Sequence, residues 1–248
     1  MSQTTNITHA DFEITRPLAL AEDEVKLWRV DLESVRSNES RWQKLLSADE
    51  SARASRFHFA LDRQCFVASR ALLRTILGGY LAAEPKELSF SYSSKEKPSL
   101  GPAYAASGLR FNVSHSGGIA LFAFARQRDV GVDIEQIRRD VEVEAIARRF
   151  FSAYEQAQLA AMPAEKKVDA FFRCWTRKEA YIKATGDGLS LPLSQFDVSL
   201  EMDETNALLA TRPDRLEANR WFLQEVVVGA DHKAALCASG QDWKLRPA

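Results

Sequence analysis

Apolar positions recur at spacings of three and four residues in some segments and of two in others, so both helices and strands are predicted. The helical spacing covers a region that begins at Ser47 and the ranges 61–81, 143–151, 152–162 and 168–185. Ser152 and Glu155 have the spacing of a capping box, which favours a helix beginning there. Gly186 suits the end of the last helix, because glycine tolerates the left-handed conformation common at that position.

Short apolar runs predict strands at 25–30, 88–92, 109–113, 119–125, 130–135, 195–200, 207–210, 221–228 and 233–238. Residues 1–16 are polar, and prolines and glycines interrupt 86–108, so both segments are predicted to be largely loop. Helices and short strands occur in each half of the chain. The sequence therefore predicts an α+β protein of two similar-sized lobes, an N-terminal lobe over 1–128 and a C-terminal lobe over 129–248.

The composition is that of a globular protein and argues against several classes of function. Of the 248 residues, 46% are hydrophobic and 27% are charged, and the formal net charge is -1. Such a chain has no general attraction to nucleic acid or to anionic membranes, so we expect neither as a partner. Cys65, Cys174 and Cys237 lack CxxC spacing, and no apolar run reaches the ~20 residues of a membrane span. We therefore expect a reduced, cytoplasmic protein without a secretory leader, a disulfide framework or a zinc site.

The predicted strand at 131–135 carries two carboxylates on one face. Because side chains alternate along a strand, Val132 and Ile134 face one side, and Asp133 and Glu135 face the other. Neighbouring carboxylates repel each other unless a cation or a proton separates them, and Mg²⁺ prefers oxygen ligands of this kind. A strand end that runs into solvent would also accept both residues, and such tripeptides are common.

Glu179 lies in the mainly apolar stripe of the helix predicted over 168–185. The helical spacing puts it beside Trp175 and Ile182, where an ionised carboxylate is unfavourable without a partner. Lys183 is one turn further along, so an ordinary i,i+4 ion pair is one interpretation. A metal ligand or proton acceptor is the other, and the local sequence favours neither.

A Ser/Gly-rich turn is predicted to follow the strand at 109–113, in the run Phe111-Asn-Val-Ser-His-Ser-Gly-Gly118. Free backbone N–H groups in such a turn, together with the side chains of Ser114 and His115, suit phosphate oxygens. A plain hairpin turn with a solvated His115 is the alternative.

Basic residues gather before and along the first long helix and in the loop after it. They are Arg53, Arg56, Arg63, Arg70, Arg74, Lys95 and Lys97. Three of the arginines recur every seven residues, which aligns them as a stripe. In a nearly neutral protein, such a stripe is either a solvated face or a local site for a multiply charged phosphate.

Taken in order, these segments closely resemble the Sfp-type 4'-phosphopantetheinyl transferases. The motifs that carry the resemblance are Arg56-Phe57, Lys97-Pro98, Phe111-Asn-Val-Ser-His-Ser116, Gly131-Val-Asp-Ile-Glu135, Trp175-x-x-Lys-Glu-Ala-Tyr-x-Lys183 and Gly186-x-Gly-Leu-Ser-Leu-Pro192. Each motif is weak alone, but their ordered conjunction is highly specific. The resemblance implies a monomer of two α+β lobes related by a pseudo-twofold axis, with coenzyme A in the cleft between them.

The resemblance also implies roles for individual residues. Asp133, Glu135 and Glu179 match the family's Mg²⁺ ligands, with Mn²⁺ as an alternative ion. Coenzyme A is the implied co-substrate, and the residues implied to bind it are Arg53, Arg56, Lys97, Ser114, His115 and Lys183. Ser114 and His115 would bind its phosphates, Lys183 would contact its pyrophosphate, and Arg53 and Arg56 match basic positions near its 3'-phosphate. Lys97 matches the lysine of the family's Gly-Lys-Pro loop. Glu179 and Lys183 are the implied catalytic residues, with Glu179 as proton acceptor. Glu96 stands where the family often has a glycine before the lysine.

The implied reaction is Mg²⁺-dependent transfer of the phosphopantetheine arm of coenzyme A to a serine of an acyl or peptidyl carrier protein, as in fatty acid, polyketide or nonribosomal peptide synthesis. Adenosine 3',5'-bisphosphate is the leaving group. Carrier proteins are typically acidic, so basic residues between the lobes would attract them. The helices around 150–151 and 159–162 are candidates for the docking surface, although core packing is the favoured use of Phe150 and Phe151.

Three other functions fit parts of the sequence. Another Mg²⁺-dependent phosphoryl or nucleotidyl transferase is one, although a glycine-rich Walker loop is lacking. A non-catalytic coenzyme A sensor or scaffold on the same fold is the second, but the carboxylates and Lys183 are intact. A nucleic-acid binder that uses the arginine stripe is the third, and it conflicts with the net charge of -1.

Overall fold

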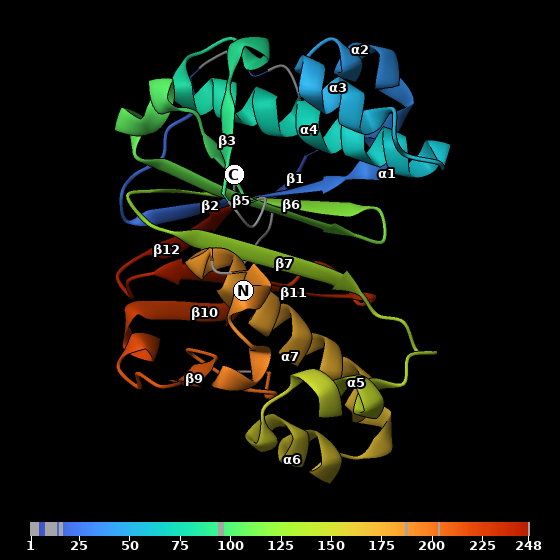
Figure 1. Cartoon of the computed structure of the whole chain (residues 1–248), viewed down its shortest axis with the longest axis vertical. Helices are drawn as coiled ribbons and strands as arrows, with labels where there is room; N and C mark the ends of the chain where they lie inside the picture. The colour runs from blue at the N-terminus through green and yellow to red at the C-terminus, as the bar shows by residue number, and fades with distance from the viewer. Residues whose placement is uncertain are drawn as a thin grey trace.

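The computed structural model describes residues 5–7, 14, 17–93, 97–186, 188–202 and 204–247. Its elements form layers, with helices on the outside and two sheets stacked between them (Figure 1). The protein is therefore an α+β protein of two lobes, as predicted.

The N-terminal lobe is built on an antiparallel sheet in which β2 (Glu24–Asp31), β6 (Ile119–Arg126) and β5 (Leu109–Ser116) lie in that order. Two short strands, β1 (Thr5–Ile7) and β12 (Lys244–Pro247), pair in parallel with β2. The last strand of the chain therefore returns to the N-terminal lobe. Strand β12 was not predicted, because its residues are mostly polar and it lies at a sheet edge.

Four helices cover the outer face of this sheet (Figure 1): α1 (Leu32–Val35), α2 (Glu39–Gln43), α3 (Ala48–Ala54) and α4 (Ala60–Leu81). The apolar side of α4 packs on β6, with Leu72, Ile76 and Phe122 in one buried cluster. Ser47 and Glu50 form a capping box at the start of α3, which confirms the predicted beginning of this region.

The proline-interrupted segment after α4 contains a hairpin rather than the single strand predicted. Strands β3 (Phe90–Tyr92) and β4 (Pro98–Leu100) pair with each other, and Lys97 directly precedes β4. A proline is tolerated at the first position of a short edge strand, which is why the sequence pattern missed β4. The described residues also form short 3₁₀ turns in both lobes: η2 (Arg36–Asn38), η3 (Pro85–Glu87), η4 (Pro102–Ser107), η5 (Gly188–Ser190), η6 (Leu193–Gln195) and η7 (Glu217–Arg220).

The C-terminal lobe has a second antiparallel sheet, in the order β10 (Trp221–Glu225), β11 (His232–Ser239) and β7 (Val130–Gln136). A small pair, β8 (Phe196–Val198) and β9 (Leu208–Thr211), lies beside it. The helices are α5 (Val143–Phe150), α6 (Ala153–Ala161) and α7 (Ala164–Thr185). Helix α7 packs across β7 and β11 and ends at Gly186, whose φ of 79° is the predicted left-handed cap.

The two sheets share a hydrophobic core, which fixes the lobes against each other. Leu27 and Leu121 of the N-terminal sheet lie in one buried cluster with Val132, Ile134 and Leu236 of the C-terminal sheet. The side chains of β7 therefore alternate as predicted, with Val132 and Ile134 in this shared core. Among the helices in the described ranges, none is long and apolar enough to cross a bilayer.

Candidate active site

The edge strands of the two sheets, β5 and β7, run side by side and form a polar seam between the lobes. Every second residue of β5 contributes a side-chain oxygen to this seam: Asn112, Ser114 and Ser116. These oxygens accept hydrogen bonds from the backbone N–H groups of Val132, Ile134 and Gln136, at 2.9, 3.4 and 3.0 Å. Side chains of the N-terminal lobe thus provide hydrogen-bond acceptors for backbone N–H groups of the C-terminal lobe.

The predicted turn between the strands at 109–113 and 119–125 is present, but it is shorter than expected. Strand β5 stays paired with β6 as far as Ser116, and only Gly117 and Gly118 turn, with φ of 54° and 81°. The alternating polar side chains of β5 point at the seam, so the strand continues where a Ser/Gly-rich turn was expected. Asn112 and Ser116 had no predicted role, although their period-two spacing with Ser114 was a readable signal.

Asp133 and Glu135 project from β7 on the face opposite the shared core. Asp133 is only 3% exposed, and its Oδ1 accepts a hydrogen bond from Ser114 Oγ at 2.9 Å. Ser116 Oγ donates to Glu135 Oε2 at 2.9 Å. The two seam serines therefore orient both carboxylates.

Lys183, on the last turn of α7, reaches the same seam. Its Nζ donates to Asp133 Oδ1 at 2.6 Å and to Ser114 Oγ at 3.1 Å. Helix α7 can approach β7 this closely because Gly131 has no side chain: a Cβ there would lie 2.2 Å from the carbonyl oxygen of Ala180. Among the described residues, Lys183 forms an ion pair with Asp133 and not the i,i+4 pair with Glu179.

Glu179 is half-buried near these groups, and within the described part of the chain its carboxylate has no hydrogen-bond or ion-pair partner. Burial raises the pKa values of Asp133, Glu135 and Glu179 above their ordinary range. The charge of Asp133 raises the pKa values of the other two further, whereas Lys183 lowers all three. The carboxylates therefore interact with one another and share a single ammonium group.

The donor set at the seam suits a hard divalent cation. Asp133 Oδ2 is buried and has no hydrogen-bond partner among the described residues, which leaves an oxygen available for a ligand. As the side chains of the described residues stand, no three His, Cys, Asp or Glu groups are arranged as a metal site. Lys183 contacts Asp133 in this arrangement, so ion binding requires these side chains to adjust.

His115 is exposed next to the seam. The protein atoms around its imidazole reduce its solvation, and with the nearby Lys183 ammonium this lowers the pKa of His115. Asp62, at the start of α4, acts in the opposite direction. The imidazole is therefore mainly neutral at neutral pH and can donate one hydrogen bond.

Arg53 and Arg56 are brought together at a separate cavity of about 640 Å³ in the N-terminal lobe. The cavity is lined by Asp49, Glu50, Arg53, Arg56, Phe57 and Tyr92. Glu50 is already paired with Arg70 and Arg74. No carboxylate in the described ranges pairs with Arg53 or Arg56, so both guanidinium groups are available to an anion.

Lys97 lies apart from Arg53 and Arg56. Its Nζ donates to the backbone carbonyl groups of Lys183, Ala184 and Val130 in the C-terminal lobe. Burial lowers the pKa of Lys97. Glu96 and Lys95 lie outside the described residues.

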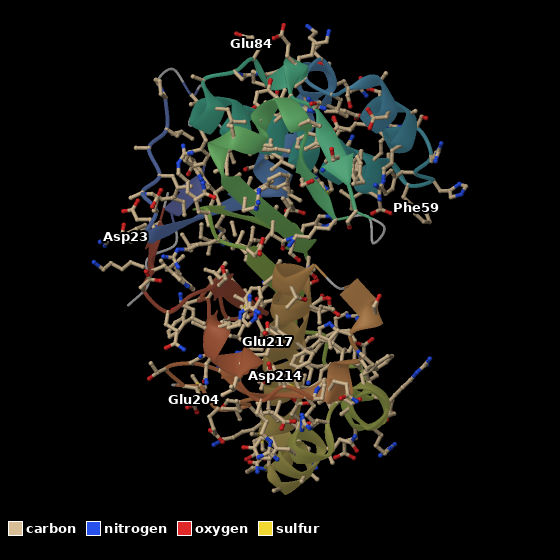
Figure 2. The ribbon with its side chains drawn as sticks, turned by 60° about the vertical axis from the view of Figure 1, so that its left-hand side comes forward. Asp23, Phe59, Glu84, Glu204, Asp214 and Glu217 are labelled. Carbon is tan, nitrogen blue, oxygen red and sulfur yellow. The ribbon has the colours of Figure 1, made fainter. Side chains whose placement is uncertain are left out.

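Another cavity, of about 390 Å³, lies in the C-terminal lobe near Asp214 and Glu217, which Figure 2 labels. Its charged groups are already paired: Glu217 accepts from Arg220 and from the Trp221 indole, and Arg212 binds Asp197. The predicted docking residues Phe151 and Leu159 are buried in the core of the same lobe. A strongly exposed aromatic ring lies instead in the N-terminal lobe: Phe59, which Figure 2 labels, is 72% exposed.

Carboxylates and a lysine at the seam, with guanidinium groups at a separate cavity of the N-terminal lobe, have the chemistry of an enzyme that acts on a polyphosphate. Comparison with known proteins gives the family. Residues 129–237 match the profile of the 4'-phosphopantetheinyl transferase superfamily, and residues 33–127 match that of the N-terminal region of 4'-phosphopantetheinyl transferase. The chain belongs to this superfamily and is a transferase of phosphopantetheine to carrier proteins.

Two curated relatives are similar over most of their length. The chain is 43% identical to 4'-phosphopantetheinyl transferase HetI of Nostoc sp., over 92% of each chain. It is 30% identical to 4'-phosphopantetheinyl transferase Sfp of Bacillus subtilis, over 82% of this chain and 86% of that protein. Among solved structures, holo-[acyl-carrier-protein] synthase of Thermotoga maritima aligns with a TM-score of 0.35 and 19% identity, over 45% of this chain and 62% of that one.

Proposed function

We propose that this transferase attaches the phosphopantetheine arm of coenzyme A to a serine of an acyl or peptidyl carrier protein with the help of Mg²⁺, or of Mn²⁺ in its place. Asp133, Glu135 and Glu179 would hold the ion. The observation that carries the proposal is the unpartnered buried oxygen of Asp133 among carboxylates whose pKa values are raised by burial and by one another. A divalent cation provides the missing partner and relieves the repulsion.

When bound, the ion supplies positive charge that neutralises phosphate oxygens as the reaction proceeds. The ammonium of Lys183 adds to that charge. It has three N–H donors, of which Asp133 and Ser114 accept two, so one remains for an oxygen of the pyrophosphate. Ser114 thereby supports the lysine, and His115 offers a further donor at the edge of the seam.

Glu179 is our candidate for the proton acceptor. Its carboxylate has no competing partner in the described part of the chain, and burial raises its pKa towards the range in which a general base works well. The carrier serine loses its proton to Glu179, directly or through a water molecule, and its oxygen attacks the β-phosphorus of coenzyme A. The bond from that phosphorus to the bridging oxygen breaks, and adenosine 3',5'-bisphosphate leaves.

Arg53 and Arg56 are proposed to bind the 3'-phosphate of coenzyme A at the cavity that they line. Both side chains are exposed, so they also contribute to attracting an acidic carrier protein. We propose that the enzyme acts as a monomer in the cytoplasm, where its three free cysteines stay reduced. The carrier supplies the serine in fatty acid, polyketide or nonribosomal peptide synthesis.

Intact-mass spectrometry tests the proposal. An apo carrier protein is mixed with coenzyme A, Mg²⁺ and this enzyme, and the carrier should gain the mass of one phosphopantetheine. EDTA should abolish the gain, and excess Mg²⁺ or Mn²⁺ should restore it. Loading that persists in EDTA would overturn the metal requirement. Binding of coenzyme A without loading of any fatty-acid, polyketide or peptide carrier would favour a sensor.

A further inference from the structure

Lys97 links the two lobes at the end of the seam opposite the carboxylates. It belongs to the β3–β4 hairpin of the N-terminal lobe, and its Nζ donates to carbonyl oxygens of the C-terminal lobe. The acceptors are the carbonyl groups of Lys183, Ala184 and Val130, the latter two at 3.4 and 3.5 Å. Val130 is three residues before Asp133, which is about 10 Å along a strand.

The last turn of α7 needs such a donor. The final carbonyl groups of a helix have no partner within the helix, and the helix dipole makes this end negative. The backbone N–H of Gly186 donates a hydrogen bond to the carbonyl oxygen of Ile182 at 3.1 Å. Lys97 supplies both a hydrogen-bond donor and a positive charge to the neighbouring carbonyl groups of Lys183 and Ala184.

Lys97 contacts the backbone of Lys183, whose side chain reaches the seam. Lys97 holds the backbone carbonyl of Lys183, while the side chain of Lys183 binds Asp133 and Ser114. A further fixed point is Gly131, where the β7 backbone lies directly against the last turns of α7. The ammonium of Lys97 is half-buried and engaged with backbone oxygens, so it is poorly placed for a phosphate at the cavity of Arg53.

We propose that Lys97 is a positioning residue: it clamps the last turn of α7 to the N-terminal lobe and thereby fixes the reach of Lys183 to the seam. This proposal rests on the proposed role of Lys183 in the reaction. It differs from what the family resemblance implies, in which Lys97 binds coenzyme A directly. The two roles predict different kinetic effects of the same substitution.

The test uses the full-length protein with Lys97→Met, which removes the ammonium but keeps an unbranched side chain. We expect kcat for carrier loading to fall about ten- to a hundredfold, because small displacements of a reacting group are costly. The Kd of coenzyme A, measured by calorimetry without carrier, should stay within about twofold. Lys97→Arg should recover much of kcat, since a guanidinium also caps carbonyl groups. Lys86→Met, at an exposed lysine of the same lobe, is the control.

A double-variant cycle separates positioning from general loss of structure. If Lys97 acts through Lys183, then Lys97→Met added to Lys183→Met should lower kcat little further, whereas independent effects would multiply. Thermal unfolding shows whether each variant is folded, and Lys97→Gln, which keeps one neutral donor, replaces Lys97→Met if that variant does not fold.

The outcomes are distinct. A Kd of coenzyme A that rises in parallel with the loss of kcat would make Lys97 a direct coenzyme A ligand and overturn the proposal. An unchanged kcat, or multiplying effects in the cycle, would also overturn it. Failure of the unmodified enzyme to load any carrier would count against the proposed function instead.

Discussion

Helix α7 carries two lysines that contact carboxylates, and the two contacts differ in what surrounds them. Lys178 binds Glu155 at 2.7 Å, and both side chains are 0% exposed. Lys183 binds Asp133 at 2.6 Å, with 29% of the lysine side chain and 4% of the aspartate side chain exposed. The two lysines are five residues apart and leave the helix on different faces, one towards the core of the lobe and one towards the seam.

The buried contact is fully satisfied. Besides Glu155, Lys178 donates to the carbonyl groups of Leu193 and Phe196, so all its donors are used. Glu155 also accepts from the backbone N–H groups of Ser152 and Val198, at 2.8 Å each. Such a contact holds α6, α7 and β8 together and offers nothing to a ligand.

The seam contact is incomplete. Within the described part of the chain, one carboxylate oxygen of Asp133 has no partner, and neither carboxylate oxygen of Glu179 has one. The protein thus leaves carboxylate oxygens unsatisfied at one lysine and satisfies all of them at the other. Since unpaired buried groups are unfavourable for folding, the difference indicates a site shaped for a ligand rather than for stability.

The largest expected effect is on turnover at the seam. Glu179→Gln should lower carrier loading by about a thousandfold or more, because it removes a proton acceptor and a charged ligand while keeping the shape. The Kd of coenzyme A should stay nearly unchanged. Quenched-flow loading assays and calorimetry measure the two quantities. Glu165→Gln, at an exposed position on the first turn of α7, is the matched control. Equal losses in turnover and in coenzyme A binding would reduce Glu179 to a plain ligand.

The second-largest effect is expected when the buried contact between Lys178 and Glu155 is broken. Lys178→Met should lower the free energy of unfolding by about 3–5 kcal/mol, because Glu155 would remain buried without its cation. Urea denaturation followed by tryptophan fluorescence measures the change. Replacing both partners, as Lys178→Met with Glu155→Leu, should recover part of the loss. An unfolding free energy within about 1 kcal/mol of the original would show that the buried pair is not what holds these elements.

The sequence predicted one of these contacts better than the other. Alternation along 130–135 correctly placed Asp133 and Glu135 opposite the shared core, and helical spacing placed Glu179 and Lys183 on α7. These are local patterns of one strand and one helix. Glu155 was recognised only as a capping-box residue, because Val198 lies 43 positions away from it in the chain.

Long-range packing explains the remaining differences. Asn112 and Ser116 bond to a strand 20 positions further along the chain, so their role depends on how the lobes meet. The acceptors of Lys97 near the end of α7 lie 86 and 87 positions away. Motif resemblance supplied the correct family, and the coenzyme A-binding role that it implies for Lys97 stays a prediction. The carbonyl acceptors of Lys97 could not be read from the motif, because a motif records residue identity and not the direction of a side chain.

A smaller effect is expected at the arginine-lined cavity, which is distinct from both lysine contacts. Arg56→Met should weaken coenzyme A binding about ten- to a hundredfold, the size expected for a lost charged hydrogen bond. The Kd of dephospho-coenzyme A, which lacks the 3'-phosphate, should change little. Arg63→Met is the control, since Arg63 is occupied by Glu39 at 2.9 Å. If the affinities for coenzyme A and dephospho-coenzyme A fall equally, Arg56 contacts a part of coenzyme A other than the 3'-phosphate.

The smallest effect separates the cap of α6 from the ion pair beneath it. Ser152 Oγ accepts from the N–H of Glu155 at 3.3 Å, whereas the backbone N–H of Ser152 donates to the Glu155 carboxylate. Ser152→Ala removes the first bond and keeps the second, so the unfolding free energy should fall by about 1 kcal/mol, as for a lost helix cap. Carrier loading should not change. A loss as large as that of Lys178→Met would mean that the hydroxyl, and not only the backbone, keeps Glu155 in place.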